Sequence, residues 1–286
     1  MKNHIKKKIF WIASYPKSGN TWMRAIISSI FFTNDGKFIF DYFKYVQSFD
    51  LDKRFEFVKK INKTDYNNLD KLETLAKYWI EGQKNIVIDG DFQFLKTHHS
   101  CVKLNNYPFT SSTITMGAIY LIRDPRDIVV SYSEHLGQNI DRTIELMVSK
   151  ETTSPYVGEK KLKVYLSSWD VHVNSWQNLD TPIFLVRYED LLTDTKNIII
   201  ELVNFFEKNF KIKFKNIKNK LENILETTHF DKFKNYEKKY GFAEASRYSN
   251  FFRKGKIYQW RNKLTNKQIK TIEGAFGNTM KQFKYL

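Results

Sequence analysis

A short loop between two apolar segments constrains the fold of this chain more than any other feature. The apolar run Ile9 to Ala13 is followed by YPKSGNTW at positions 15–22, and then by an apolar-rich stretch from Met23 to Phe32. This order predicts a buried strand, a tight loop and a helix. Strand–loop–helix units of this kind build α/β folds, in which helices cover a parallel sheet.

The loop has the composition of a binding site for a phosphate or sulfate group. A helix that opens in Ser-Gly-Asn-Thr offers unpaired backbone N–H groups and the positive end of its dipole to an anion. Gly19 lets the backbone approach closely, Ser18 and Thr21 carry hydroxyl donors, and Lys17 adds a positive charge. The order differs from the nucleotide-triphosphate loop G-x-x-x-x-G-K-[ST], because Lys17 precedes Gly19. The alternative is a simple turn in which the Ser-Gly pair only starts a helix.

The composition provides a large core and no sign of a linker. Of the 286 residues, 42% are hydrophobic and 24 are phenylalanine, whereas only 11 glycines and 5 prolines are present. No Ser/Gly-rich or Pro-rich junction and no internal repeat interrupts the sequence, which predicts a single domain over residues 1–286. One cysteine, Cys101, excludes an internal disulfide and a metal site made of several cysteines.

The charge balance favours anionic ligands. The chain has 47 Lys and Arg against 31 Asp and Glu, a formal net charge of +16, and such a field attracts phosphorylated molecules and nucleic acid. A solvated basic surface accounts for most of this excess, and no zinc-finger spacing or RNP-type motif makes nucleic acid a required partner. The apolar run after the basic N-terminus is too short for a signal peptide, and no stretch approaches the roughly 20 apolar residues of a membrane span. We therefore predict a cytoplasmic protein without a membrane span.

Apolar periodicity predicts further strands and helices along the chain. The expected strands are Phe92 to Thr97, Ala118 to Ile122 and Ile183 to Val186. The expected helices cover Asp70 to Gln83, Pro125 to about His135 with Asp124 as N-cap, Lys161 to Asn178, Asn197 to Lys208, Leu221 to Glu226 and Asn266 to Phe276. This alternation predicts a P-loop-like three-layer α/β fold with a central parallel sheet flanked by helices.

Three polar segments follow predicted strands and are expected to line one crevice. They contain Lys17, the tetrad from Lys96 to His99, and Arg123. In a parallel sheet the ligand sits beyond the carboxyl ends of the strands. Because side chains alternate along a strand, His99 is expected to point away from His98. Arg126 and Asp127, just after Arg123, are expected to be surface or helix-cap charges.

Five segments in order resemble the motifs of the cytosolic-type sulfotransferases, which use 3′-phosphoadenosine 5′-phosphosulfate as donor. Tyr15 to Trp22 resembles their 5′-phosphosulfate loop, and Tyr120 to Tyr132 (YLIRDPRDIVVSY) resembles their 3′-phosphate segment. Lys96 to His98 resembles the K-T-H that contains the catalytic base, and Phe184 to Leu191 (FLVRYEDL) resembles the strand before an adenine-contacting tyrosine. Phe252 to Thr265 resembles the R-K-G-x-x-G-D-W-x-N-x-x-T signature.

The resemblance implies transfer of a sulfuryl group to a hydroxyl or amine of a small acceptor, without a metal. It implies His98 as general base, Lys17 at the leaving group and Lys96 as an assisting cation. Histidine and lysine suit sulfuryl transfer, because a neutral imidazole accepts a proton near neutral pH and a cation stabilises charge that develops on a leaving oxygen. The residues implied to bind the donor, and its product 3′-phosphoadenosine 5′-phosphate (PAP), are Lys17, Ser18, Gly19, Asn20, Thr21, Trp22, Arg123, Ser131, Tyr188, Thr228, Phe230, Arg253, Lys254 and Gly255.

Two departures from the family pattern affect these expectations. Asn20 replaces the first of two threonines usual in the loop, and Ile257 to Trp260 lacks the Gly-Asp of G-D-W. The segment from Lys267 to Glu273 matches the family's dimer motif only in part, so monomer and homodimer both stay open.

The acceptor and the rival functions are also left open by the sequence. An acceptor pocket with apolar walls, for an alcohol, a phenol or an amine, is one interpretation of the aromatic side chains; ordinary core packing is the other. The aromatic residues concerned are Phe38, Phe40, Tyr42, Phe43, Tyr45, Phe92 and Tyr132. The rivals are a kinase-like phosphotransferase and a non-catalytic protein that binds anions or nucleic acid.

Overall fold

The computed structural model describes residues 9–88, 90–154 and 162–286. The basic residues before Ile9, and Lys161 at the expected start of a helix, lie outside these ranges. A central sheet has the strand order β2-β3-β1-β6-β7. Its strands are β1 (Ile9–Ser14), β2 (Gln47–Ser48), β3 (Gln93–Thr97), β6 (Thr115–Ile122) and β7 (Ile183–Arg187).

The strand pairing confirms the predicted parallel sheet and shows that β1 and β3 end next to each other. Both β1 and β2 pair with β3 in parallel, and Ala13 of β1 is opposite Thr97 of β3. The next residues, Ser14 and His98, therefore stand side by side where the two strands end. All six residues of β1 are buried, as expected of an apolar strand covered by helices on both faces.

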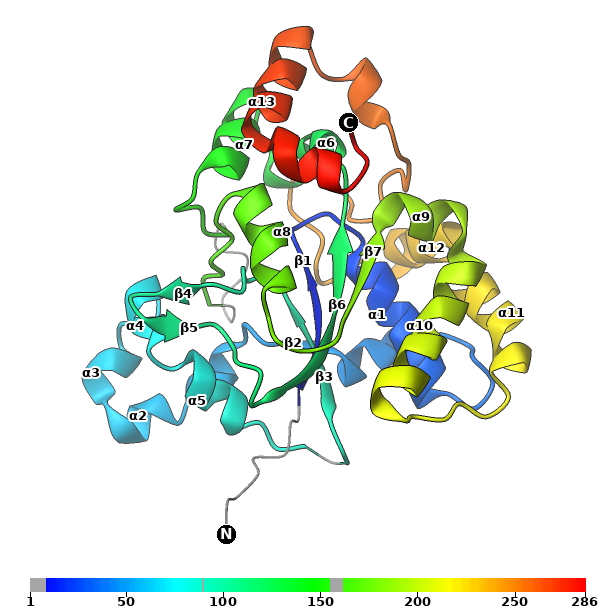
Figure 1. Cartoon of the computed structure of the whole chain (residues 1–286), viewed down its shortest axis with the longest axis horizontal. Coiled ribbons are helices and arrows are strands. Elements are labelled where there is room, and N and C mark those ends of the chain that lie inside the picture. The colour runs from blue at the N-terminus through cyan, green and yellow to red at the C-terminus, as the bar shows by residue number, and fades with distance from the viewer. Residues whose placement is uncertain (1–8, 89, 155–161) are drawn as a thin grey trace. The chain divides into compact units, whose positions relative to one another are not determined.

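By contacts, the chain divides into two compact units, each made of several chain segments. The first unit contains the described residues up to Tyr15, together with Val46–Tyr120 and Ser149–Ile183. Its helices are α2 (Val58–Ile61), α3 (Lys63–Tyr66), α4 (Leu72–Ala76), α5 (Trp79–Lys84) and α8 (Trp169–Gln177), with a 3-10 helix at Asp52–Phe55 and a hairpin of β4 (Lys103–Leu104) and β5 (Tyr107–Pro108). Figure 1 shows α2 to α5 gathered on one side of this unit, near the hairpin.

Packing in the core of the first unit explains why a segment predicted as one helix forms two, α4 and α5. The ring centroids of Trp11 and Trp79 lie 5.3 and 5.6 Å from that of Phe109, and both tryptophans are fully buried. The chain turns at Lys77 and Tyr78, between α4 and α5, and so places Trp79 in this cluster. The prediction of one helix from residue 70 to residue 83 was therefore wrong, since tertiary packing overrides local periodicity.

The helix predicted from Lys161 to Asn178 begins only at Trp169. Before it, the chain pairs its backbone with other segments: Ser154 N–H donates to Val164 O and Leu166 N–H donates to Thr152 O, at 2.8 and 2.9 Å. These inter-segment hydrogen bonds replace helical ones, and the apolar pattern of the sequence did not distinguish the two.

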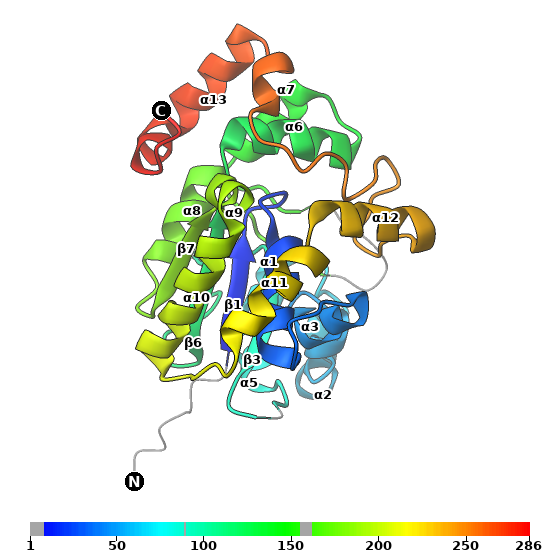
Figure 2. The ribbon, with the colours of Figure 1, turned by 90° about the vertical axis from the view of Figure 1, so that its right-hand side faces the viewer.

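The second unit contains Pro16–Tyr45, Leu121–Val148 and Phe184–Leu286. Its helices are α1 (Asn20–Phe32), α6 (Pro125–Leu136), α7 (Ile140–Val148), α9 (Tyr188–Thr193), α10 (Thr195–Phe210), α11 (Ile217–Thr227), α12 (Phe230–Tyr240) and α13 (Asn266–Gln282), with 3-10 helices at Phe40–Tyr45 and Gln259–Asn262. Within this unit α13 packs against α6 and α7, and α11 packs against α1 and α10 (Figure 2). No helix in the described ranges has the length and apolar content needed to cross a membrane.

Side chains cap two helices of the second unit, and the N-cap predicted at Asp124 is confirmed. Asp124 caps α6 by accepting a hydrogen bond from Arg126 N at 2.9 Å, and Pro125 occupies the first turn. Thr265 and Gln268 form a capping box at the start of α13. Helices α10, α11 and α13 extend beyond the bounds predicted for them, and α7, α9 and α12 were not predicted.

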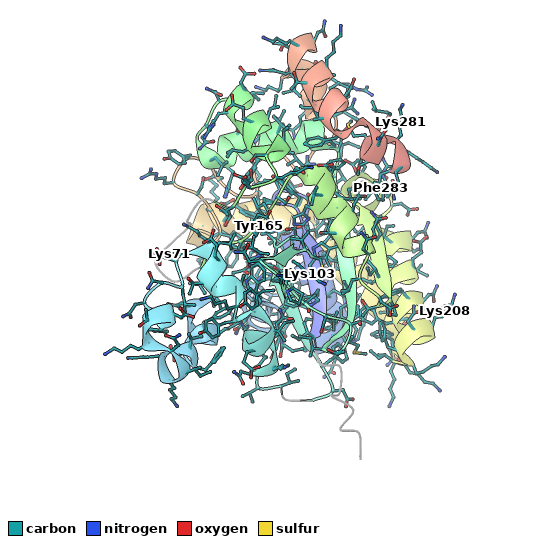
Figure 3. The ribbon with its side chains drawn as sticks, turned by 60° about the vertical axis from the view of Figure 1, so that its left-hand side comes forward. Lys71, Lys103, Tyr165, Lys208, Lys281 and Phe283 are labelled. Carbon is teal, nitrogen blue, oxygen red and sulfur yellow. The ribbon has the colours of Figure 1, made fainter. Side chains whose placement is uncertain are left out.

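The excess positive charge is concentrated in the C-terminal part of the second unit. Residues 207–286 contain twenty Lys and Arg and only seven Asp and Glu. Many of these lysines are exposed, such as Lys208 on α10 and Lys281 on α13, which are labelled in Figure 3. This part of the chain therefore attracts anions.

Candidate active site

The predicted phosphosulfate loop has a conformation that requires glycine. It runs from the end of β1 into α1, and Gly19 has φ +96° as the N-cap of that helix. A Cβ at this position would lie 2.7 Å from Tyr188 Cδ2, closer than such atoms approach. Lys17 also has positive φ, at +65°. The loop is thus held in a sparsely populated conformation, which is common at ligand sites.

Buried polar atoms of the loop fit an anionic ligand. Ser18 Oγ and Trp22 Nε1 are buried, and neither has a hydrogen-bond partner among the described residues. Thr21 Oγ1 donates to Glu244 Oε2 at 3.4 Å, and Glu244 also forms an ion pair with Arg24. A buried polar atom without a partner costs free energy. A ligand with phosphate or sulfate oxygens would satisfy the hydroxyl of Ser18.

Lys17 is a cation in an unusual environment. Its Nζ lies 4.2 Å from the centre of the Phe251 ring. Burial lowers the pKa of Lys17 from 10.5 to about 8, and the charges of Arg123 and Arg253 act in the same direction, whereas Glu244 opposes them. Lys17 therefore remains mostly protonated at pH 7, with a proton that it can release more easily than an ordinary lysine.

Arg123 connects the loop with the segment after Gly255. Its Nη1 donates to Lys17 O and its Nη2 donates to Lys256 O, both at 2.9 Å. Its guanidinium lies 4.4 Å from the centre of the Tyr188 ring, and its Nε is buried without a partner in the described chain. Arg123 is thus fixed in place with one donor available for a phosphate.

Arg126 and Asp127 are not surface charges, in contrast to the expectation. Both are buried, with 6% and 1% exposure. Arg126 pairs with Asp124 at 2.7 Å and donates to Tyr285 O at 2.8 Å. Asp127 accepts hydrogen bonds from the backbone N–H groups of Tyr258 and Trp260, at 2.7 and 3.1 Å. Asp127 thereby fixes the segment in which the family's Gly-Asp is absent, a role that requires tertiary contacts to recognise.

Of the remaining 3′-phosphate candidates, Arg253 and Lys254 line a basic cavity. Ser131 is half-buried on α6, Arg253 pairs with Glu134, and Gly255 has φ +59° with the Phe230 ring packed against it. A cavity of about 380 Å³ next to this segment is lined by Lys234, Arg253, Lys254, Lys256, Gln259, Asn262 and Lys263.

Three of the lysines that line the cavity were missed by sequence analysis. They are Lys234, Lys256 and Lys263, and like Lys254 none of them forms an ion pair within the described ranges. Like charges close together repel one another, so an anion in the cavity is favourable. The only signal in the sequence was the density of lysines.

Two aromatic side chains predicted to contact adenine lie together. The rings of Trp22 and Tyr188 are 6.3 Å apart, edge to face. Phe230 begins α12 and its ring lies 6.5 Å from that of Phe252. The hydroxyl of Thr228 donates to Ile224 O at 2.7 Å, so only its oxygen lone pairs could serve a ligand. The entire predicted set of donor-binding residues falls in the second unit.

The two other predicted catalytic residues, Lys96 and His98, belong to the first unit. Lys96 is buried on β3, opposite Ile12 of β1. His98 Nδ1 lies 2.7 Å from the backbone oxygen of Ser14. Because a carbonyl only accepts hydrogen bonds, Nδ1 must have the hydrogen, and Nε2 then has the lone pair of a general base.

His99 has a structural environment that differs from that of His98. It is 1% exposed, and its Nε2 lies 3.2 Å from Asp50 Oδ1. Its Nδ1 accepts a hydrogen bond from Tyr165 N at 3.0 Å. Burial opposes ionisation of Asp50, yet the hydrogen bond from His99 outweighs it, with Lys96 acting in the same direction, and the pKa of Asp50 is lowered. Both nitrogens of His99 are therefore engaged in holding the fold.

The aromatic stretch after α1 packs largely within the protein. Phe38 is buried in a cluster with Ala25, Phe233 and Phe252, and Phe40 stacks on Tyr236. Phe92, in the first unit, packs against Phe10 and Phe94, and Tyr132 on α6 is buried. These contacts favour core packing for Phe38 and Tyr132.

Comparison with known proteins identifies the family. The family model described as "Sulfotransferase domain" matches residues 7–284. The chain belongs to this family. The predicted family is thereby confirmed, and the enzyme is a sulfotransferase.

Curated relatives match over nearly the whole chain. Sulfotransferase 2A1 of Mus musculus is 28% identical over 287 residues, which is 98% of this chain and 86% of the relative. Sulfotransferase 1E1 of Rattus norvegicus is 25% identical and covers 94% of this chain and 82% of its own length. The amine sulfotransferase of Oryctolagus cuniculus is 22% identical and covers 98% and 83%.

Solved structures share the fold. Mouse sulfotransferase SULT7A1, complexed with PAP, has a TM-score of 0.56 at 19% identity, covering 96% of this chain and 84% of that one. Retinol dehydratase in complex with androsterone and PAP has a TM-score of 0.60 at 20% identity, covering 96% and 80%. These similarities confirm the predicted α/β architecture.

Proposed function

We propose that this sulfotransferase moves a sulfuryl group from 3′-phosphoadenosine 5′-phosphosulfate to a hydroxyl or amine of a small acceptor. The observation that carries the proposal is a pair of cationic sites joined by one residue. Arg123 hydrogen-bonds both to Lys17 of the phosphosulfate loop and to Lys256 beside the basic cavity. A nucleotide with phosphates at both its 3′ and 5′ positions needs two such sites.

The donor's 5′ end fits the loop from Lys17 to Trp22. The buried hydroxyl of Ser18 and the N-terminus of α1 supply donors, and Gly19 leaves room next to Tyr188. Trp22 and Tyr188 supply aromatic faces for the adenine. The 3′-phosphate would contact Arg123, Ser131 and Arg253, since guanidinium groups bind phosphate oxygens in pairs.

In the transfer step, His98 Nε2 takes the proton of the acceptor's hydroxyl or amine. The acceptor atom forms a bond to sulfur while the bond between sulfur and the bridging oxygen breaks. The electron pair of that bond stays on the bridging oxygen of the 5′-phosphate, where Lys17 neutralises the charge. Lys96 would assist at the sulfate oxygens. A positioned base of this kind contributes roughly 100- to 10,000-fold in rate.

The names of the relatives support a broad class of acceptor. Their names include a 3-beta-hydroxysteroid sulfotransferase of Cavia porcellus and an amine sulfotransferase of Oryctolagus cuniculus. We infer that the acceptor is a small alcohol, phenol or amine. Cytoplasmic localisation and a single domain over residues 1–286 remain predictions, and both monomer and homodimer are compatible with the proposal.

Donor recognition can be tested with the product nucleotide. PAP should raise the melting temperature much more than AMP, which lacks the 3′-phosphate, because only PAP uses both cationic sites. Equal shifts would contradict the assignment of Arg123, Ser131 and Arg253 to the 3′-phosphate.

Catalysis can be tested with labelled donor and a panel of acceptors. His98→Asn should abolish transfer while PAP binding persists, and Lys17→Met should weaken both. Lys208→Met, which removes an exposed lysine on α10, is the control and should behave as wild type. Full activity of the His98 variant would remove this residue from the mechanism.

The two rival functions predict different results. A kinase-like phosphotransferase would transfer a phosphoryl group from ATP, and its activity would depend on magnesium. A nucleic-acid-binding protein would bind DNA with an affinity that falls steeply with salt, and His98 would be dispensable.

A further inference from the structure

The backbone next to the candidate base is held by helix α8. His172 Nε2 lies 3.0 Å from the carbonyl oxygen of His98, and Trp176 Nε1 donates to the carbonyl of His99 at 2.9 Å. Both side chains are fully buried. Since β3 ends at Thr97, the two histidines lie beyond its ladder, and α8 supplies the hydrogen bonds that would otherwise be missing.

The hydrogen bonds of His172 define its tautomer. A carbonyl oxygen only accepts, so Nε2 has the hydrogen and donates to His98 O. His172 Nδ1 then accepts the hydroxyl hydrogen of Tyr120, whose oxygen is 2.8 Å away. Burial lowers the pKa of His172 to about 4, so the ring stays neutral around pH 7 and keeps this arrangement.

The other end of this chain of hydrogen bonds reaches the phosphosulfate loop. The backbone N–H of Tyr15 interacts with the Tyr120 hydroxyl oxygen, and the Tyr15 ring lies edge-on to His172, with centroids 5.3 Å apart. Tyr15 directly follows β1 and stands two residues before Lys17. The order of donors and acceptors is therefore Tyr15 N–H, Tyr120 O–H, His172 and the carbonyl of His98.

We propose that His172 is a positioning residue for the transfer reaction. It fixes the main chain at His98 and, through Tyr120, ties it to the start of the donor loop, so that His98 Nδ1 keeps its bond to Ser14 O and Nε2 keeps its direction. The inference rests on the proposed function, because it takes His98 as the base. It goes further by assigning a role to a buried helix residue with no contact to the reacting atoms.

Substitution of His172 separates positioning from binding. His172→Phe keeps a ring of similar size but removes both hydrogen bonds, and should lower kcat by up to about 100-fold, because misplacement of a reacting group by about 1 Å has an effect of that size. The Kd for PAP should stay within about twofold of wild type, since the predicted donor-binding residues lie in the second unit. His172→Gln retains an N–H at the ε position and should recover most of the lost kcat.

A matched control lies on the same helix. Ser175 Oγ accepts a hydrogen bond from Cys101 N and donates to His172 O, both at 2.8 Å, but it does not contact His98. Ser175→Ala should lower the melting temperature and leave kcat near wild type. Tyr120→Phe removes only the hydroxyl, so it tests the same chain if His172→Phe fails to fold, and it should also lower kcat without changing the Kd for PAP.

The outcomes distinguish this inference from the proposed function. If His98→Asn is inactive while His172→Phe and Tyr120→Phe both turn over as wild type, the positioning role is refuted and the base stands. If His172→Gln is as impaired as His172→Phe, the hydrogen bond to His98 O is not the cause. If His98→Asn is fully active, the proposed mechanism itself fails.

Discussion

Alanine at position 19 should disturb the phosphosulfate loop by an amount that can be worked out from the structure. Gly19 has φ +96°, where a side chain is strained by about 1–2 kcal/mol. The new Cβ would also meet Tyr188 Cδ2 at 2.7 Å. A shift of the ring would disturb its contact with Arg123, whose guanidinium lies 4.4 Å from the ring centre. We therefore expect Gly19→Ala to raise the free energy of this loop conformation by about 2 kcal/mol or more.

The cost must appear either in stability or in affinity. If the loop keeps its conformation in Gly19→Ala, the free energy of unfolding falls by about 2 kcal/mol. If the loop relaxes, stability is preserved and binding of PAP must restore the strained form, which weakens the Kd by about 30-fold or more for a cost of about 2 kcal/mol or more. Urea unfolding and calorimetric titration with PAP measure the two quantities on the same sample.

A second glycine provides the matched control. Gly274 lies in α13, and no atom within 4 Å would meet a Cβ there. Gly274→Ala should be neutral or stabilise the protein by about 0.5–1 kcal/mol, because alanine favours a helix. In a Tyr188→Ala background, Gly19→Ala should cost less, since only the backbone strain remains. Wild-type stability together with wild-type affinity for PAP in Gly19→Ala would refute the reasoning.

Three other predictions concern charge. Because the pKa of Lys17 is about 8, PAP binding should weaken as the pH rises through 8. In a series of titrations at different pH, Lys17→Met should remove this dependence. An unchanged pH dependence in the variant would contradict the assignment to Lys17. Asp50→Ala leaves the buried Nε2–H of His99 without its acceptor and should destabilise the protein by about 1–3 kcal/mol in urea unfolding at pH 7. Because the folded-state pKa of Asp50 is lowered, the stability that its ionised form contributes is present above the usual value near 3.9 and is lost as the pH falls through the lowered one. The stability difference between wild type and Asp50→Ala should therefore shrink in acid, and a constant difference would argue against an ionised Asp50 as the acceptor. Replacing three lysines of the basic cavity by glutamine should weaken PAP binding more than ADP binding at low salt. The same change at three exposed lysines elsewhere should affect the binding of both nucleotides alike. If the two triple variants have equal effects, the preference for PAP comes from overall charge and not from the cavity. The cavity lysines are Lys234, Lys256 and Lys263, and the control lysines are Lys208, Lys213 and Lys281.

Local sequence signals were sufficient for the parts of the site that consist of consecutive residues. The loop from Tyr15 to Trp22 was predicted with its strand and helix because the apolar pattern changes period there, and Gly19 marks the required backbone conformation. The cap at Asp124 was equally visible, since it depends on residues within one turn.

Contacts between distant residues were decided by the tertiary structure. Asp127 resembles a helix-cap charge in the sequence, yet it holds the backbone of Tyr258 and Trp260, more than 130 residues away. His172 carries no motif, and only the fold brings its ring to the carbonyl of His98. Likewise, nothing in the sequence distinguishes Lys234 from the many other lysines of the C-terminal part.

The sequence by itself determined the reaction class, the parallel α/β architecture and the strand and helix on either side of the loop at Lys17. The tertiary structure decided the tautomers of His98 and His172, the structural role of His99, and the lowered pKa of Lys17. The physical reason is the separation along the chain over which each kind of interaction acts. Backbone conformation and hydrophobic periodicity act between near neighbours in the chain, whereas burial and hydrogen-bond direction depend on groups that become neighbours only when the chain folds.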